Sequence, residues 1–173
     1  FPSTAHLELM LRAYMTNAGE GPKRILTTTL DAMCSGGMYD HVGGGFARYS
    51  TDREWLVPHF EKMLYDQALL LGIYLRGVIV LGRPQYRLVV EETTEYVLSV
   101  LQQPGGGFAS AEDADSLDPD GNSVEGWFAT WTPAEVRAAL RDDPDVAAET
   151  VDALLDWYGI TEEGNFEGRS IPN

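Results

Sequence analysis

The sequence is poor in cysteine, in basic side chains and in long apolar runs, and each shortage excludes a class of protein. Cys34 is the only cysteine among 173 residues, so the chain has no internal disulfide and no thiolate zinc site. Twelve basic residues stand against 27 acidic ones, a net charge of −15, which disfavours nucleic-acid and anionic-membrane partners. No run of about 18 apolar residues predicts a transmembrane helix. We expect a cytoplasmic protein with no metal and no cofactor.

Prolines and apolar spacing predict about six helices and little strand. Proline is tolerated in a first helical turn, and six prolines each precede a stretch with apolar residues at helical spacing. The longest stretch follows Pro58, and we expect His59, Glu61 and Lys62 in the first turn of that helix. The six are Pro2, Pro22, Pro58, Pro84, Pro133 and Pro144.

Capping signals mark the last two of these helices. Thr132 and Glu135 have the spacing of a capping box, in which each side chain bonds the backbone N–H of the other. Asp143, directly before a proline, is expected to cap the last helix, which Gly159 would end.

A glycine–phenylalanine motif occurs three times. Residues 43–47 and 105–109 both read GGGFA, and Gly164-Asn165-Phe166 is a weaker copy, so the phenylalanines are 62 and 58 residues apart. A near-constant period indicates a repeat, here a helix pair followed by a glycine–phenylalanine loop. Helix pairs need neighbours to bury their faces. We therefore predict an all-α region, 1–173, of three αα-hairpins that forms a fragment of a larger α/α toroid of six hairpins. The glycine-rich loops have room for short strands, and a complete small α domain is the alternative.

The first glycine-rich loop and the segment after it hold most candidate site residues. His59 and Glu61 are the candidate acid and base, because outward N–H groups in a first helical turn suit such a role. Glu61 and Tyr65 are expected to share a helix face. In the alternative, Glu61 only complements the helix dipole and its neighbours are solvated. The candidate ligand-binding residues here are Tyr39, Asp40, His41, Arg48, Tyr65 and Asp66.

The second loop, from about residue 110 to 128, is acidic and aromatic. Glu112, Asp113 and Asp115 are candidate catalytic partners, since glycosidic chemistry needs two carboxylates at a fixed separation. Trp127 is a candidate platform for a sugar ring. An EF-hand alignment fails because a tryptophan takes the place of the last glutamate ligand. A less regular, oxygen-rich calcium site remains an alternative. The other alternative is a solvated acidic turn around Asp120.

Several of these segments together resemble one family. Residues 36–46, 48–50, 55–66 (WLVPHFEKMLYD), 110–116 (SAEDADS), 158–161 and 164–168 are similar to the spermatogenesis-associated protein 20 family, whose bacterial members are thioredoxin-domain-containing proteins of the DUF255 type. The resemblance implies a thioredoxin-like domain followed by a six-hairpin toroid similar to those of glycosidases and N-acylglucosamine 2-epimerases. This chain would be the first part of the toroid, with the thioredoxin-like domain as a partner in the full-length protein. Ala47, Ala109 and Ala129 depart from the family pattern, which has histidine or aromatic residues there.

Two functions stay open. In the first, the chain binds or processes a sugar or another small molecule, as a glycoside hydrolase or a sugar epimerase does, through carboxylate and histidine proton transfer. In the second, it is a non-catalytic scaffold or peptide-binding module beside a redox domain, and the motifs are structural clamps between hairpins.

Overall fold

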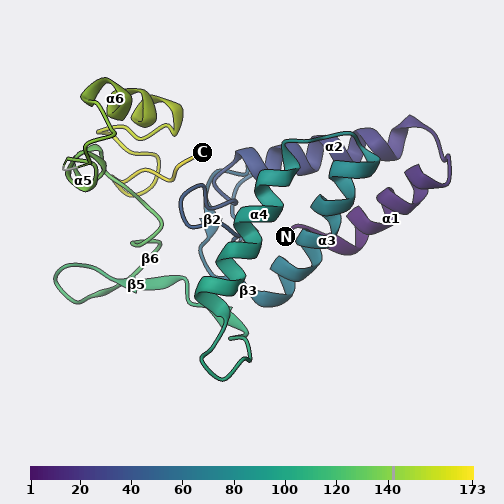
Figure 1. Cartoon of the computed structure of the whole chain (residues 1–173), viewed down its shortest axis with the longest axis horizontal. Helices are drawn as coiled ribbons and strands as arrows, with labels where there is room; N and C mark the ends of the chain where they lie inside the picture. Colours follow the sequence, from purple (N-terminus) through teal and green to yellow (C-terminus); the bar gives the residue numbers. More distant parts are fainter. Residues whose placement is uncertain (142) are drawn as a thin grey trace. The chain divides into compact units, whose positions relative to one another are not determined.

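Helices are the main regular elements of the structure, as the proline and apolar spacing predict (Figure 1). The computed structural model describes residues 1–141 and 143–173, which form two units, Phe1–Ala114 (unit 1) and Asp115–Asn173 (unit 2). These described residues contain six α-helices, one short π-helix and six strands of two or three residues. Within the same residues, every helix falls short of the length and apolar character that a bilayer crossing needs.

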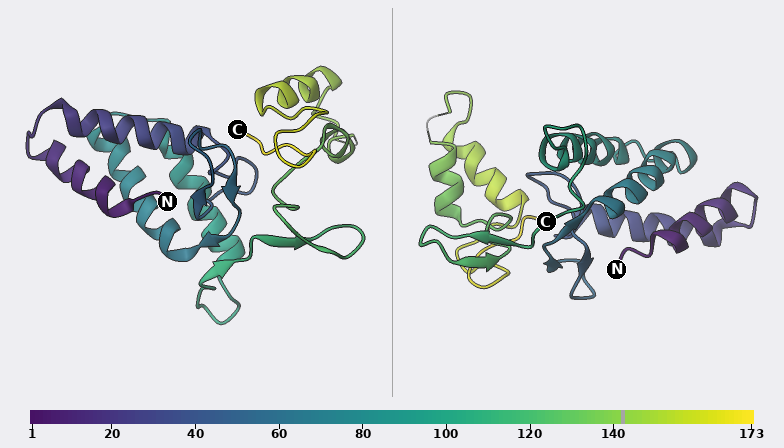
Figure 2. Two further views of the ribbon diagram at one scale, coloured as in Figure 1. Left: turned by 180° about the vertical axis from the view of Figure 1, so that it is seen from behind. Right: turned by 90° about the horizontal axis from the view of Figure 1, so that it is seen from below.

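Unit 1 is built on two helix pairs. The first pair is α1 (Thr4–Met15) and α2 (Glu20–Ser35). The second is α3 (Leu64–Val80) and α4 (Tyr86–Tyr96), which continues into the π-helix η1 (Val97–Leu101). α3 contacts both α1 and α4, and the view from below shows α3 between them (Figure 2). α3 is therefore the central helix of unit 1.

The core of unit 1 combines apolar residues from all four α-helices. Buried tyrosines join the helices, because the Tyr74 hydroxyl donates to the Leu30 carbonyl at 2.8 Å and the Tyr86 hydroxyl donates to Asp31 Oδ1 at 2.6 Å. Burial of these side chains supplies most of the stabilisation of the helix packing. The core includes Leu7, Leu11, Leu26, Leu30, Met33, Leu70, Ile73, Tyr74, Tyr86 and Val89.

The predicted helix start after Pro58 is wrong. α3 begins at Leu64, and the preceding residues form two short strands, β2 (Pro58–His59) and β3 (Lys62–Met63). β2 pairs antiparallel with β1 (Tyr49–Ser50), and β3 pairs antiparallel with β4 (Ala111–Glu112). Pairing with β1 and β4 satisfies the backbone N–H and C=O groups of β2 and β3 in extended conformation. The apolar spacing of the segment does not reveal these distant strand partners. The candidate residues of this segment thus precede the helix.

The repeated GGGFA segments share sequence but not packing. Gly44 (φ +75°) and Gly45 (φ +81°) lie against α4, and a Cβ on Gly44 would come within 2.6 Å of the Glu92 carbonyl oxygen. A Cβ on Gly106 (φ +84°) would meet no described atom within 4 Å. The phenylalanines nevertheless occupy similar places, each in an antiparallel bridge after a helix pair: Tyr39 with Phe46, Gln102 with Phe108, and Phe166 with Arg169.

Unit 2 contains a β-hairpin and a helix pair. The strands β5 (Asp115–Leu117) and β6 (Ser123–Glu125) pair antiparallel, and the helices are α5 (Pro133–Ala139) and α6 (Ala148–Trp157). A small apolar cluster, Val151, Leu155 and Ile160, holds the second helix.

The cap predictions for unit 2 are partly right. The capping box at α5 is confirmed, with the Glu135 N–H donating to Thr132 Oγ1 and the Thr132 N–H donating to Glu135 Oε2. Gly159, with φ +62°, follows the end of α6 as expected. The predicted cap at Asp143 is wrong, because α6 begins at Ala148. The Asp143 carboxylate accepts the N–H of Asp145 at 2.9 Å and so closes a turn before the helix.

Candidate functional site

Arg48 and Glu61 form an ion pair where two extended segments of unit 1 meet. The N–H of Arg48 donates to the Glu61 carbonyl at 2.8 Å, which joins the segments beyond the β1–β2 pairing. The guanidinium Nη1 of Arg48 lies 2.7 Å from Glu61 Oε2. The hydrogen bond with Glu61 raises the pKa of Arg48 above its ordinary value, and the nearby Tyr65 adds to this effect.

His59 lies beside the same carboxylate. Its Nε2 is 3.8 Å from Glu61 Oε2, and its ring stacks on Tyr49 with the centroids 5.1 Å apart. Tyr49 is also the residue opposite His59 in the strand pair, so the backbone pairing fixes the position of this imidazole. The structure therefore brings His59, Glu61 and Arg48 together, through strands and not through the predicted helix. Glu61 and Tyr65 do not share a helix face, because α3 starts after Glu61.

Asp66 is the most unusual titratable side chain of this region. It lies in the first turn of α3 and is only 7% exposed, and its Oδ2 has no hydrogen-bond partner among the described residues. Burial raises the pKa of Asp66 to about 6, although the positive charge of Arg48 partly offsets this effect. A carboxyl group with a pKa near neutrality can both donate and accept a proton under physiological conditions. We refer to Arg48, His59, Glu61, Tyr65 and Asp66 as the Glu61 cluster.

A second polar group, which the sequence did not predict as a unit, surrounds Lys62. This side chain is only 8% exposed, and its Nζ lies 2.7 Å from Asp40 Oδ2 and 2.9 Å from the Gly44 carbonyl oxygen. The ammonium also lies over the Tyr96 ring, 4.4 Å from the centroid. Asp40 accepts the N–H groups of Val42 and Gly43 as well. Lys62 and Asp40 thus fix the first glycine–phenylalanine loop against the rest of unit 1.

Three more predicted site residues, Glu112, Tyr39 and His41, form contacts within unit 1. Glu112 Oε2 accepts the Tyr96 hydroxyl at 2.7 Å, and burial together with this bond raises the pKa of Tyr96. Tyr39 is 3% exposed and donates to Glu92 Oε2, so it cannot serve as an open stacking platform. The His41 ring lies edge-on to Tyr39, and its Nε2 is 3.0 Å from the Gly36 carbonyl oxygen.

The remaining carboxylates of the second loop are on the surface. Asp113 is exposed near the end of unit 1. Asp115, in β5 of unit 2, is exposed as well and accepts the Ser123 hydroxyl at 3.1 Å. Asp118 accepts backbone N–H groups two and four residues ahead, which matches the solvated turn considered from the sequence. No three His, Cys, Asp or Glu side chains in the described part of the chain gather as a metal site requires.

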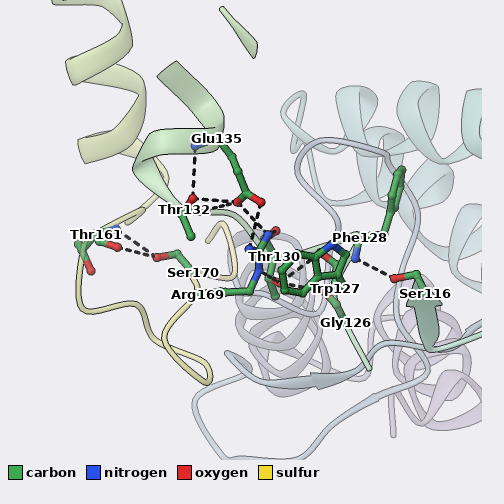
Figure 3. A network of polar contacts seen from close by, with 10 residues as sticks. All are labelled: Ser116, Gly126, Trp127, Phe128, Thr130, Thr132, Glu135, Thr161, Arg169 and Ser170. Atoms are coloured by element: carbon green, nitrogen blue, oxygen red, sulfur yellow. Dashed lines mark hydrogen bonds and ion pairs between the residues drawn. The ribbon is translucent and has the colours of Figure 1, made fainter. Parts of the chain in front are cut away.

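Trp127 lies in unit 2, where Arg169 packs against it (Figure 3). The guanidinium carbon of Arg169 is 4.0 Å from the Trp127 ring centroid, so one face of the predicted platform is covered. Arg169 also donates to Thr130 Oγ1 at 2.8 Å and pairs with Glu135 at 2.9 Å. The position of Arg169 could not be predicted from the sequence, because its neighbours in sequence carry no periodic signal.

Known relatives support the resemblance seen in the motifs. The chain is 39% identical to spermatogenesis-associated protein 20 of Mus musculus over 181 residues and to that of Homo sapiens over 180 residues, which covers 100% and 99% of the chain. It is 36% identical to an uncharacterized protein of Caenorhabditis elegans, over its whole length. The chain spans only about a quarter of these relatives, 23% to 25% of their length. No family model matches it.

Proposed function

We propose that unit 1 carries an acid–base site for a small polyhydroxylated ligand, most directly a sugar, at the Glu61 cluster. We further propose that the chain belongs to the spermatogenesis-associated protein 20 family and contributes three hairpins to an α/α toroid. The observation that carries the functional proposal is Asp66, a buried carboxyl group with an unpaired oxygen among the described residues and a pKa of about 6. Support for the toroid comes from the three helix pairs, each followed by a phenylalanine in a bridge.

The Glu61 cluster has the parts that proton transfer to a sugar needs. Asp66 is the proton donor or acceptor, because its pKa lets both forms be populated near pH 6 to 7. Glu61, fixed by Arg48 at 2.7 Å, supplies the second carboxylate. Tyr65, a residue that is 49% exposed, adds a hydroxyl group near Arg48 that can hydrogen-bond a ligand. His59 is a further titratable group 3.8 Å from Glu61.

A thermal-shift screen with a panel of sugars tests this proposal. A sugar that binds only the folded chain must raise the unfolding midpoint. We expect a shift with one class of sugar, lost in Asp66→Asn and in Glu61→Gln. Glu95→Gln, which removes an exposed carboxylate on α4, is the control and should keep the shift. Proton exchange or bond cleavage of that sugar, followed by NMR, should also be lost in Asp66→Asn.

The scaffold alternative is favoured by a different observation. Asp40 and Glu112, two predicted site residues, are held by Lys62 and Tyr96 in contacts that join separate segments of unit 1. If these contacts are the only purpose of the motifs, no sugar shifts the midpoint of a chain that melts cooperatively. Alanine substitutions at both positions then lower stability without any ligand-dependent change, and the sugar proposal is rejected.

A further inference from the structure

A hollow in unit 1 lies between the start of α2 and the connection from α3 to α4. Its volume is about 770 Å³, within the range of pockets that bind small molecules and larger than a single phosphate group needs. Gly21 and Gly82 contribute bare backbone to it, and a Cβ on either would meet no described atom within 4 Å. Leu81, 8% exposed, gives it an apolar wall. The hollow shares no residue with the Glu61 cluster.

The lining of this hollow is positive in a strongly negative chain. Lys23, Arg24 and Arg83 line it, against a single acidic residue, Glu20. Three of only twelve basic side chains in the sequence therefore gather in one place. The ion pair between Lys23 and Glu20 is loose at 3.8 Å, and Arg24 forms no ion pair within the described part of the chain. At physiological ionic strength, charges more than about 8 Å away are largely screened. The local excess of positive charge therefore favours an anionic ligand in this hollow, despite the net charge of −15.

An ion pair with Asp31 holds the Arg83 side chain in position. Its Nη2 lies 3.1 Å from Asp31 Oδ2, while Asp31 Oδ1 accepts the hydroxyl of the fully buried Tyr86 at 2.6 Å. A guanidinium has five N–H donors, so this one pair leaves others for a ligand. The arginine is thus positioned before a ligand arrives, which lowers the entropy cost of binding.

We propose that this hollow binds a small molecule bearing two or more phosphate groups, with Arg24, Arg83 and Lys23 contacting the phosphate oxygens. Arginine side chains form paired hydrogen bonds with phosphate. The first turn of α2, where Gly19 provides no side-chain cap, adds backbone N–H groups that favour an anion. Three cationic side chains match the charge of a diphosphate better than that of inorganic phosphate. This site is independent of the proposed sugar site.

Calorimetric titration of the chain with inorganic pyrophosphate at about 0.15 M salt, where the Debye length is about 8 Å, tests the proposal. We expect saturable binding of one pyrophosphate per chain that weakens as salt is added. Arg24→Gln and Arg83→Gln should each weaken it by about tenfold or more, the effect of losing a charge-assisted contact. Arg53→Gln is the matched control, since this exposed arginine of unit 1 lies outside the hollow and should change affinity by less than about twofold.

The proposal is overturned by no saturable heat with pyrophosphate, by equal weakening in Arg53→Gln, or by citrate binding as tightly as pyrophosphate. Inorganic phosphate should bind more weakly than pyrophosphate, and equal affinity also counts against a diphosphate site. Arg83→Gln also removes the ion pair with Asp31, so Arg83→Lys is a second control. It keeps the positive charge and should retain more affinity for pyrophosphate than Arg83→Gln. Arg24→Gln should leave the melting midpoint unchanged, because the Arg24 side chain is exposed.

Discussion

Replacing Lys62 by methionine should destabilise unit 1 more than any exposed charge change. Methionine keeps most of the side-chain length but removes the ammonium that lies 2.7 Å from Asp40 Oδ2. Asp40 would remain largely buried, with a carboxylate that keeps only its two backbone N–H donors. Removing one partner of a buried ion pair costs about 3 to 5 kcal/mol. Because 15% of the Asp40 side chain is exposed, we expect the lower end, about 3 kcal/mol.

The pH dependence of this loss identifies its cause. In the wild type, burial raises the pKa of Asp40, but Lys62 and the backbone N–H donors outweigh it and hold that pKa below its ordinary value. The pair therefore stabilises the fold above the ordinary aspartate pKa, and this contribution is lost as pH falls through the lower, folded-state pKa. Without Lys62, burial is less opposed and Asp40 takes up a proton more readily. The penalty of Lys62→Met should therefore be largest near pH 7 and smaller near pH 4.

Urea unfolding followed by circular dichroism at both pH values measures this penalty. Lys23→Met is the matched control, because the only other lysine of the chain has an ion pair of 3.8 Å in an exposed setting and should cost less than about 1 kcal/mol. A Lys62→Met penalty below about 1 kcal/mol at pH 7, or one of the same size at pH 4, would refute the buried-pair reasoning.

Three further predictions concern other parts of the chain. Gly44→Ala should lower the free energy of unfolding more than Gly106→Ala, although both glycines have positive φ, because only at the first does the new Cβ collide with α4. Arg169→Ala should destabilise unit 2 by about 2 kcal/mol and change tryptophan fluorescence, whereas Arg137→Ala, which breaks an exposed pair, should cost less than about 1 kcal/mol. Asp66→Asn should raise stability at pH 8 but not at pH 4, as argued below. Urea unfolding measures each of these effects. Equal effects of the two glycine substitutions, or of the two arginine substitutions, would contradict the packing described above.

The helices could be predicted from the sequence because each carries a long apolar period. Leu26, Leu30 and Met33 of α2 recur at helical spacing and are fully buried. The capping box at Thr132 could also be predicted, since its two residues lie three apart in the sequence and need no distant partner.

The strands could not be predicted in the same way. β3 has two residues, too few for a period of two to be visible, and Lys62 pairs with Glu112, a residue distant in the sequence. The apolar pattern that follows Pro58 continues through this segment, so it suggested a helix six residues too early. That error placed Glu61 on a helix, although the motif groups it with His59 and Asp66, which lie near it in the structure.

Part of the candidate site could be predicted from the sequence. Asp66 lies four residues before Leu70 and seven before Ile73, both buried on the same face of α3, so helical spacing does signal that this carboxylate points toward the interior. The motif predicts Asp66 as a ligand-binding residue, whereas its burial follows from this spacing along α3. Arg169 stands in an irregular glycine-containing segment, where no periodicity can indicate that it will pack on Trp127.

Asp66 also separates the two proposed functions better than any other residue. A loss of activity at Glu112 would be ambiguous, because that side chain also accepts the hydroxyl of buried Tyr96. Asp66 is different, since its pKa rises from 3.8 to about 6 on folding, and the native state therefore loses stability as pH rises through that interval. Asp66→Asn removes this cost and should stabilise the chain by up to about 3 kcal/mol at pH 8. A structural residue is destabilising when replaced, whereas a residue retained for chemistry can be stabilising when replaced. A variant that is more stable at pH 8 and no longer responds to sugar would favour the acid–base site, whereas one that is less stable at pH 8 would favour the scaffold.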